Sequence, residues 1–162
     1  MVGKSPSLLN EIDREWPPGR LDSDYHIAWR WLDITTKKAE TFVIVDDSGK
    51  PAAIWCSAKR RPIKLNDGKF YRLDYMEAAP ELRGGNIGLF LISVIAARAV
   101  ELGACGVVLQ TWDCALRRYY TDLGAVCSAP TGWNIAANLI PFTIETTLLK
   151  TLSAYIKGFE NG

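Results

Sequence analysis

The sequence predicts a single α/β domain with a mixed, mostly antiparallel sheet and helices on its faces. Three observations support this fold class. Residues 40–59 have the pattern of a β-hairpin, residues 88–102 that of a buried helix, and residues 106–112 that of a short apolar strand. A strand, a helix and a second strand in this order predict two parallel strands joined by a right-handed crossover. Because the preceding hairpin is antiparallel, the sheet is expected to be mixed.

The composition of the 162 residues is that of an ordinary globular protein, with 48% hydrophobic and 23% charged residues. A net charge of +1 gives no electrostatic reason to expect nucleic acid or a membrane as partner. The N-terminus lacks the apolar core of a signal peptide, and the apolar run 87–102 is too short to span a bilayer. Four cysteines without CxxC spacing and one histidine give no zinc pattern. We therefore expect a reduced, cytoplasmic protein without a metal.

The N-terminal half is predicted to hold one helix and the strands of the hairpins. Residues 1–24 are polar and interrupted by Pro-Pro-Gly, and only 8–16 have a helical pattern. Residues 25–34 fit either a strand or a short helix. In 40–59, two β-rich runs flank Asp-Asp-Ser-Gly-Lys, which is typical of a hairpin turn. Residues 60–69 are predicted to be a second turn region, and 69–79 a third strand that ends at Pro80.

The C-terminal half alternates helices and strands. Residues 88–102 contain no proline and almost no polar side chain, which favours a buried helix with Gly103 at its C-terminal cap. A strand at 106–112 follows, and then a helix over 114–123 that Asp113 is placed to cap and Gly124 to end. Residues 132–147 have the composition of a strand. Apolar residues at 144, 148, 152, 155 and 156 predict a C-terminal amphipathic helix.

A glycine-rich loop stands between the third strand and the long helix. Gly84, Gly85 and Gly88 have no Cβ, so the backbone amides there can approach a ligand closely. The loop ends at a helix N-terminus, where free N–H groups and the helix dipole favour an anion. A diphosphate is the natural occupant, and Arg83 would add a charge-assisted hydrogen bond. The alternative is that the glycines merely permit a tight turn from strand to helix.

The loop does not fit two better-known phosphate-binding motifs. A P-loop requires the pattern GxxxxGK[ST], and this pattern does not occur in the sequence. A dinucleotide-binding GxGxxG lies next to the first strand of its βαβ unit, whereas three strands are predicted before this loop.

Residues 83–88, Arg-Gly-Gly-Asn-Ile-Gly, resemble motif A of the GNAT superfamily of acyl-CoA-dependent N-acyltransferases, whose pattern is [QR]-x-x-G-x-[GA]. Asn86 stands where the family usually has glycine, and asparagine tolerates positive φ better than most residues. Residues 120–125, Tyr-Thr-Asp-Leu-Gly-Ala, resemble the family's YxxLGF segment, with Ala125 in place of the aromatic residue. The resemblance covers about residues 40–128 in the family's order and spacing.

The resemblance implies the GNAT fold, in which strands four and five are parallel but splayed and hold the acyl-CoA between them. It also implies an organisation into a variable acceptor region (1–36), a core with the coenzyme motif (40–128), and C-terminal strands and helix (129–162). The implied donor is acetyl-CoA. The coenzyme-binding residues carried over are Ala78, Ala79, Arg83, Gly84, Gly85, Asn86, Ile87, Gly88, Asp113 and Tyr120.

Within this frame, residues 70–79 correspond to strand four, which is predicted to help polarise the thioester. Tyr120 is predicted to act as the general acid. The backbone near Glu77 and Ala78 would bind the pantetheine arm and act as an oxyanion hole. Tyr120 matches the family's tyrosine, and a phenol pKa near 10 is close to that of an alkyl thiol. The alternatives are that the small residues 78 and 79 reflect a crowded core, that Tyr120 is a core residue, and that Asp113 only caps its helix.

The sequence offers more than one candidate for the base that deprotonates the amine. The family often places a carboxylate on strand four, and this strand carries Asp74 and Glu77. Strict alternation puts Asp74 on the face of Met76 and Ala78 and Glu77 on the other, and a β-bulge would reverse this. The alternative for each is a solvated or salt-bridged carboxylate on the surface. His26 has a suitable pKa, but a structural or surface role is the simpler interpretation.

Two further features have both functional and plain interpretations. Residues 59–64, Lys-Arg-Arg-Pro-Ile-Lys, are a basic cluster near Trp55 that fits an acidic substrate, RNA or the 3′-phosphate of coenzyme A, or simply a solvated turn. Trp16, Trp29 and Trp31 lie in the family's acceptor region, where they fit an aromatic pocket, core packing or a homodimer contact.

Two functions therefore compete. The first is an acetyl-CoA-dependent N-acetyltransferase that acts on a small-molecule or peptide amine by direct attack in a ternary complex. The second is a non-catalytic acyl-CoA-binding or protein-interaction module on the same fold. RNA binding is the weakest option because the net charge is close to zero. Fold alone does not choose the acceptor.

Overall fold

The computed structural model describes residues 2–3, 5–16, 30–35, 39–83, 85–111, 114–135 and 139–160. Within these ranges it leaves the side chains of 2–3, 114–115 and 157–160 undescribed. The chain divides into two compact units, and each is described by itself. The first unit comprises Met1–Arg60 and Tyr75–Gly88, and the second comprises Arg61–Asp74 and Leu89–Gly162.

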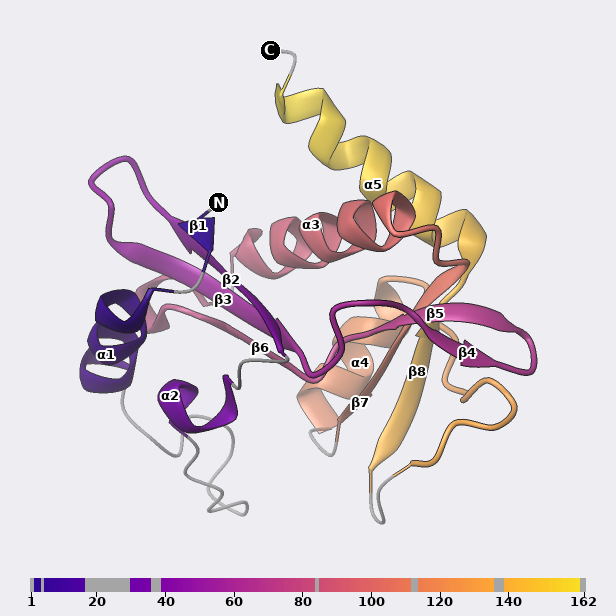
Figure 1. Cartoon of the computed structure of the whole chain (residues 1–162). Helices are drawn as coiled ribbons and strands as arrows, with labels where there is room; N and C mark the ends of the chain where they lie inside the picture. Colours follow the sequence, from indigo (N-terminus) through magenta and orange to yellow (C-terminus); the bar gives the residue numbers. More distant parts are fainter. Residues whose placement is uncertain are drawn as a thin grey trace. The chain divides into compact units, whose positions relative to one another are not determined.

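The first unit is built on an antiparallel sheet with the strand order β1-β2-β3-β6 (Figure 1). The predicted hairpin at 40–59 is confirmed, and the side chain of Asp46 holds its turn by accepting from the backbone N–H groups of Ser48 and Lys50, both at 2.9 Å. The strands are β1 (Val2–Gly3), β2 (Glu40–Val45), β3 (Pro51–Ser57) and β6 (Tyr75–Ala78). The helices are α1 (Pro6–Glu15), α2 (Trp31–Ile34) and the 3-10 turn η1 (Pro80–Leu82).

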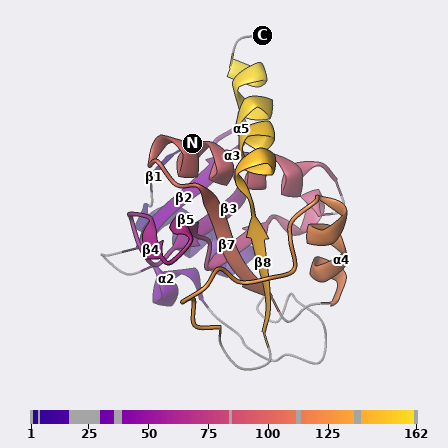
Figure 2. The ribbon, with the colours of Figure 1, turned by 90° about the vertical axis from the view of Figure 1, so that its right-hand side faces the viewer.

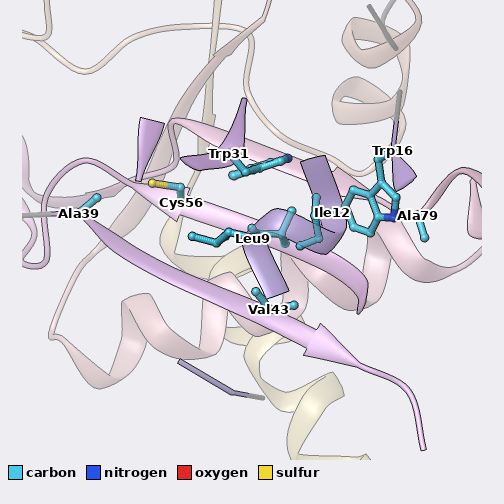
Figure 3. Packing of buried hydrophobic residues seen from close by; sticks show 9 residues of the cluster. Leu9, Ile12, Trp16, Trp31, Ala39, Val43, Cys56 and Ala79 are labelled. Carbon is cyan, nitrogen blue, oxygen red and sulfur yellow. The ribbon is translucent and has the colours of Figure 1, made fainter. Parts of the chain in front are cut away.

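The core of this unit forms where α1 and α2 meet one face of the sheet (Figure 3). Trp16 and Trp31 are both fully buried in it, so of the three interpretations offered for these tryptophans, core packing holds for these two. Trp29 lies outside the described residues. The other members of the cluster are Leu9, Ile12, Ala39, Val43, Ile54, Cys56 and Ala79.

The second unit contains the predicted parallel pair (Figure 2). Its strand order is β4-β5-β7-β8, and only β5 and β7 run parallel. The strands are β4 (Ile63–Leu65), β5 (Gly68–Arg72), β7 (Gly106–Thr111) and β8 (Ile140–Ile144). The helices are α3 (Ile87–Glu101), α4 (Cys114–Asp122) and α5 (Thr146–Glu160). The long buried helix, its terminating Gly103 (φ +69°) and the glycine that ends α4, Gly124 (φ +92°), are as predicted.

The strand predicted at 69–79 is divided into two. Its first part, β5, belongs to the second sheet, and its second part, β6, belongs to the first. The division falls at Leu73 and Asp74. The backbone N–H of Leu73 still donates to the carbonyl of Val108 in β7, at 2.9 Å, whereas Tyr75 already pairs with Cys56 of β3. Instead of the one mixed sheet expected, the structure therefore has two four-stranded sheets, one of them mixed.

Three other local predictions need correction. The predicted turn region 60–69 contains β4, because its apolar residues at 63 and 65 pair with β5. The strand predicted over 132–147 is confined to 140–144. The apolar face of α5 also differs, since Leu149, Leu152 and Ile156 are buried while Tyr155 is exposed. Position 144 lies in β8, and α5 begins after it, so the helical phase cannot be extended from that residue.

Candidate functional site

Strand β6 forms the edge of the first sheet and leads through η1 into the glycine-rich loop. The N–H of Ala79, just after β6, donates to the carbonyl of Ala52 in β3 at 2.9 Å. Since successive residues of a strand direct their backbone groups to opposite sides, the N–H and C=O of Ala78 face away from β3. Of the two backbone positions predicted to bind a thioester, Ala78 is thus the one at the outer edge, while Glu77 directs its N–H toward β3. Ala79 packs its side chain into the core.

The carboxylate of Glu77 is the centre of a small polar network. Its side chain is only 10% exposed, and both oxygens accept hydrogen bonds. The indole Nε1–H of Trp31 donates to Oε2 at 2.8 Å, and Nη2 of Arg83 donates to Oε1 at 2.9 Å. Within β6, Glu77 shares a face with Tyr75, and Met76 and Ala78 lie on the other, as strict alternation predicted.

Arg83 is held by two contacts on the edge strand. Besides the bond to Glu77, its Nε donates to the outward carbonyl of Ala78 at 3.2 Å. An arginine has five N–H donors, so three remain that bond to no other residue in the described part of the chain. The side chain is 38% exposed. The predicted anion-binding arginine is therefore fixed in orientation and still accessible.

The loop itself is exposed at Gly85 and Asn86, and α3 begins at Ile87, with Gly88 in its first turn. Among the described residues, a Cβ built on Gly85 would meet only the carbonyl oxygen of Leu82, at 3.5 Å, which is an ordinary contact. Gly85 also has no positive φ, so the fold does not require glycine at this position. The tight-turn interpretation fails for Gly85. Gly84 lies outside the described residues.

Helix α4 of the second unit carries two adjacent tyrosines with different surroundings. Tyr120 is 3% exposed, and its ring lies against Phe142 of β8 at a centroid distance of 5.3 Å. Its carbonyl accepts from the N–H of Ala125, which closes the helix after the segment that resembles the YxxLGF pattern. The hydroxyl of Tyr119 is buried without a hydrogen-bond partner in the described part of the chain. Burial raises the pKa of Tyr119.

The second predicted carboxylate, Asp74, lies at the division between β5 and β6. Its side chain is 7% exposed and forms an ion pair with Arg72. Asp74 thus belongs to the second unit and Glu77 to the first. Two further candidates, His26 and Asp113, lie outside the described residues.

Trp55, the aromatic residue near the basic cluster 59–64 in the sequence, has its side chain buried in β3. Lys59, Arg60, Arg61 and Lys64 are exposed. In the described residues no three His, Cys, Asp or Glu side chains are grouped so that they could hold a metal ion. None of the helices described has the length and apolar character needed to cross a membrane.

The link from Trp31 to Glu77 was not foreseen from the sequence. The two residues are 46 positions apart, and a single tryptophan in a sequence gives no signal of its hydrogen-bond partner. The related capping contact of α2 was equally hidden: Asp13 of α1 accepts from the N–H groups of Trp31 at 2.6 Å and Leu32 at 3.1 Å.

Comparison with known proteins decides the family. The family model of the acetyltransferase (GNAT) family matches residues 5–125. The chain belongs to the GNAT acetyltransferase family. The match includes the arginine-glycine loop and the tyrosine segment of α4, and it begins well before the region on which the resemblance was first based.

Solved structures agree on the GNAT fold. The chain is 13% identical to a chimera of the spermidine N-acetyltransferase SpeG from Vibrio cholerae and hSSAT, with a TM-score of 0.59 over 92% of this chain and 96% of that one. It is 20% identical to a nourseothricin acetyltransferase (TM-score 0.51, 68% of this chain and 66% of that one). It is 16% identical to a bacterial toxin (TM-score 0.55, 71% and 72%). At these identities the likeness establishes the fold alone.

The chain spans slightly less than two thirds of the nourseothricin acetyltransferase. No curated protein matches it. The GNAT family assignment therefore rests on the family model, with the fold supported independently by the solved structures.

Proposed function

We propose that this GNAT protein transfers an acetyl group from acetyl-CoA to a primary amine, by direct attack within a ternary complex. The observation that carries the proposal is the loop after β6. It presents a glycine that the fold does not require, next to an arginine that is oriented and accessible. A residue type without a structural reason points to a ligand that approaches the backbone closely.

On the coenzyme side, the loop would take the diphosphate and β6 would take the thioester end. Arg83 has three N–H donors left for an anion. The N–H of Ala78, at the outer edge of β6, is the donor proposed for the thioester carbonyl, where it would stabilise the oxyanion. The full set proposed for the coenzyme is Ala78, Ala79, Arg83, Gly84, Gly85, Asn86, Ile87, Gly88, Asp113 and Tyr120.

Acyl transfer to an amine requires two proton movements. The ammonium must lose a proton before it attacks, and the departing thiolate must gain one. Tyr120 is the proposed general acid, because the ordinary pKa of a phenol lies close to that of the thiol it would protonate. Asp74 is the base proposed for the first step. Asp74 and Glu77, the other carboxylate that the sequence offered, are each held by an arginine, Arg72 and Arg83 respectively.

The acceptor is proposed only as a class, a small-molecule or peptide amine, in a cytoplasmic setting. The similar structures are named for spermidine, for nourseothricin and as a toxin, and these names do not agree on one acceptor. The homodimer contact stays a prediction. The alternative function is a coenzyme-binding or interaction module without catalysis, which Asn86 in place of the family's usual glycine would favour.

The test has two stages. Coenzyme A is first added during thermal unfolding, where a ligand at 100 times its Kd stabilises the folded state by about 2.7 kcal/mol. Acetyl-CoA is then mixed with a panel of polyamines, amino acids, antibiotics and peptides, and the free thiol released is measured. Stabilisation without thiol release from any amine would favour the binding module. No stabilisation at all would overturn both coenzyme-dependent functions.

Tyr120→Phe separates the acid from the binding site. We expect kcat to fall about 100-fold, since general acid catalysis is lost, while the Kd of coenzyme A changes little. Equal kcat in the variant would remove Tyr120 from the proposed role.

A further inference from the structure

We propose that Glu77 is a positioning residue, which orients the loop's arginine from the core through Trp31, and not the base that deprotonates the amine. The inference rests on the proposed function, because it assigns Arg83 to an anionic coenzyme. It is argued from contacts within the first unit alone.

The first step is the occupancy of the carboxylate. A base that takes a proton from an amine needs an oxygen that is free to accept it. Both oxygens of Glu77 are engaged, Oε2 by the indole of Trp31 and Oε1 by the guanidinium of Arg83. The geometry therefore describes an anchor better than a base.

The second step is the rigidity of the anchor. Trp31 is completely buried in the α1–α2 core, and Asp13 fixes the N-terminus of its helix. The indole ring thus has one orientation, and its Nε1–H is held at 2.8 Å from Glu77. The hydrogen bond to a core tryptophan already restricts the rotamers of Glu77 before it contacts Arg83. A surface glutamate would instead lose that rotamer freedom when it formed the ion pair.

The third step is what the anchor does for Arg83. The side chain of Arg83 is anchored at Nη2 by Glu77 and at Nε by the carbonyl of Ala78. These two bonds fix the plane of the guanidinium and leave Nη1 and one N–H of Nη2 without a partner among the residues described. The arrangement orients the cation before a ligand arrives, so the ligand does not meet the cost of ordering a long side chain.

The test compares variants in the full-length protein by calorimetric titration with coenzyme A. Trp31→Phe keeps the aromatic ring in the core but removes the indole N–H, and Glu77→Gln removes the charge. We expect each to raise the Kd of coenzyme A about tenfold, with kcat at saturating acetyl-CoA changed by less than about threefold. Combining Glu77→Gln with Arg83→Gln should add little to the effect of Arg83→Gln alone, because both act through one contact.

Two matched controls separate positioning from damage. Trp16→Phe alters another buried tryptophan of the same core, and Glu81→Gln removes an exposed carboxylate close to the loop in sequence. Neither is expected to change the Kd of coenzyme A by more than about twofold. If Trp16→Phe weakens coenzyme binding as much as Trp31→Phe does, the effect comes from the core and the proposal fails.

The remaining outcomes are each decisive. A collapse of kcat in Glu77→Gln with an unchanged Kd and loss of the acidic limb of the pH profile would restore the base. Tighter coenzyme binding by Glu77→Gln would mean that Glu77 competes for Arg83, which also overturns the positioning role. Failure of the unaltered protein to bind coenzyme A would overturn the proposed function, and the positioning role with it. Binding by the unaltered protein that neither variant changes would overturn the positioning role alone.

The network can also be observed without coenzyme. In a proton–nitrogen correlation spectrum, Glu77→Gln should shift the indole resonance of Trp31 and increase the exchange of its N–H with water. An indole signal that does not respond would show that the hydrogen bond to Glu77 is absent in solution.

Discussion

Two glycines, one in each unit, have opposite relations to the fold. Gly106 opens β7 in the second unit, where an added Cβ would lie 2.7 Å from the backbone oxygen of Ile144 and 3.0 Å from the ring of Phe70. Gly85 lies in the loop of the first unit, where an added Cβ would meet one atom of the described residues, at an ordinary distance. Packing therefore explains Gly106 and does not explain Gly85.

The difference shows how function can be separated from folding at the level of a residue. Where the fold forces a residue type, that type carries no information about ligands. Where the fold tolerates a larger residue, glycine is left to be explained by something outside the chain. The same distinction applies to polar side chains that lack a structural partner.

The largest effect is expected from Gly106→Ala. The new methyl group would collide with the β8 backbone and with Phe70 of β5, so either the parallel pairing or the β7–β8 pairing must shift. We expect a loss of about 2–4 kcal/mol in the free energy of unfolding, measured by urea denaturation. If Gly106→Ala were as stable as the unaltered protein, the space beside Gly106 would be larger than the structure indicates.

Gly85→Ala should have the reverse profile. Its free energy of unfolding should stay within about 1 kcal/mol, or rise slightly, because alanine restricts the unfolded chain. Its Kd for coenzyme A should increase at least about tenfold, as judged by calorimetric titration, since the methyl group would stand where the proposed diphosphate approaches. Unchanged affinity would mean that the loop does not make the close contact on which the proposed function depends.

These contrasts also indicate which parts of the fold the sequence could predict. The hairpin, the long helix and the parallel pair follow from local signals such as Asp46–Lys50 and the fifteen-residue apolar run of α3. The division of 69–79 at Leu73 and Asp74 does not, because both parts have strand-forming residues and only the partner strands differ. Similarly, the buried face of α5 depends on where the helix starts, which its apolar spacing does not determine.

The candidate site was predictable as a list of residues and not as a set of contacts. The loop motif and Tyr120 were identified from sequence patterns, and a carboxylate at 77 was expected on the strand. That this carboxylate is bound by Trp31, 46 residues away, depends on the packing of α2 against the sheet. Long-range hydrogen bonds of this kind leave no local pattern in a single sequence.

Tyr119 of α4 is a further residue that the fold does not require. Tyr119 has a buried hydroxyl without a partner among the described residues, so the fold gains nothing from it. We expect Tyr119→Phe to be neutral or stabilising by up to about 1 kcal/mol in urea denaturation at pH 7. Burial raises the pKa of Tyr119 above its ordinary value of 10.0 because the fold disfavours the phenolate. The free energy of unfolding is therefore insensitive to this titration below pH 10 and falls as pH rises from 10 through the folded-state pKa.

The alkaline decline in stability should accordingly be shallower in Tyr119→Phe than in the unaltered protein. Unfolding experiments between pH 9 and 11 measure this difference. A marked destabilisation of Tyr119→Phe at pH 7 would show that its hydroxyl has a partner that the fold relies on.

The smallest effect is expected at the surface next to the loop, where Lys50 of the hairpin pairs with Glu81 of η1 at 2.9 Å. The hydrogen bond with Lys50 lowers the pKa of Glu81 below 4.5, and the same bond raises the pKa of Lys50 above 10.5. The stabilisation from Glu81 is therefore present above pH 4.5 and lost as pH falls through its folded-state pKa, while that from Lys50 is lost only as pH rises beyond 10.5.

The variant Glu81→Gln should lower the free energy of unfolding slightly, and by a constant amount from pH 5 to 10. Below the folded-state pKa of Glu81, the variant and the unaltered protein should be equally stable. Because exposed pairs are screened, the difference should also shrink at high salt, and a difference that survives both acid and salt would assign Glu81 a role in packing beside the loop.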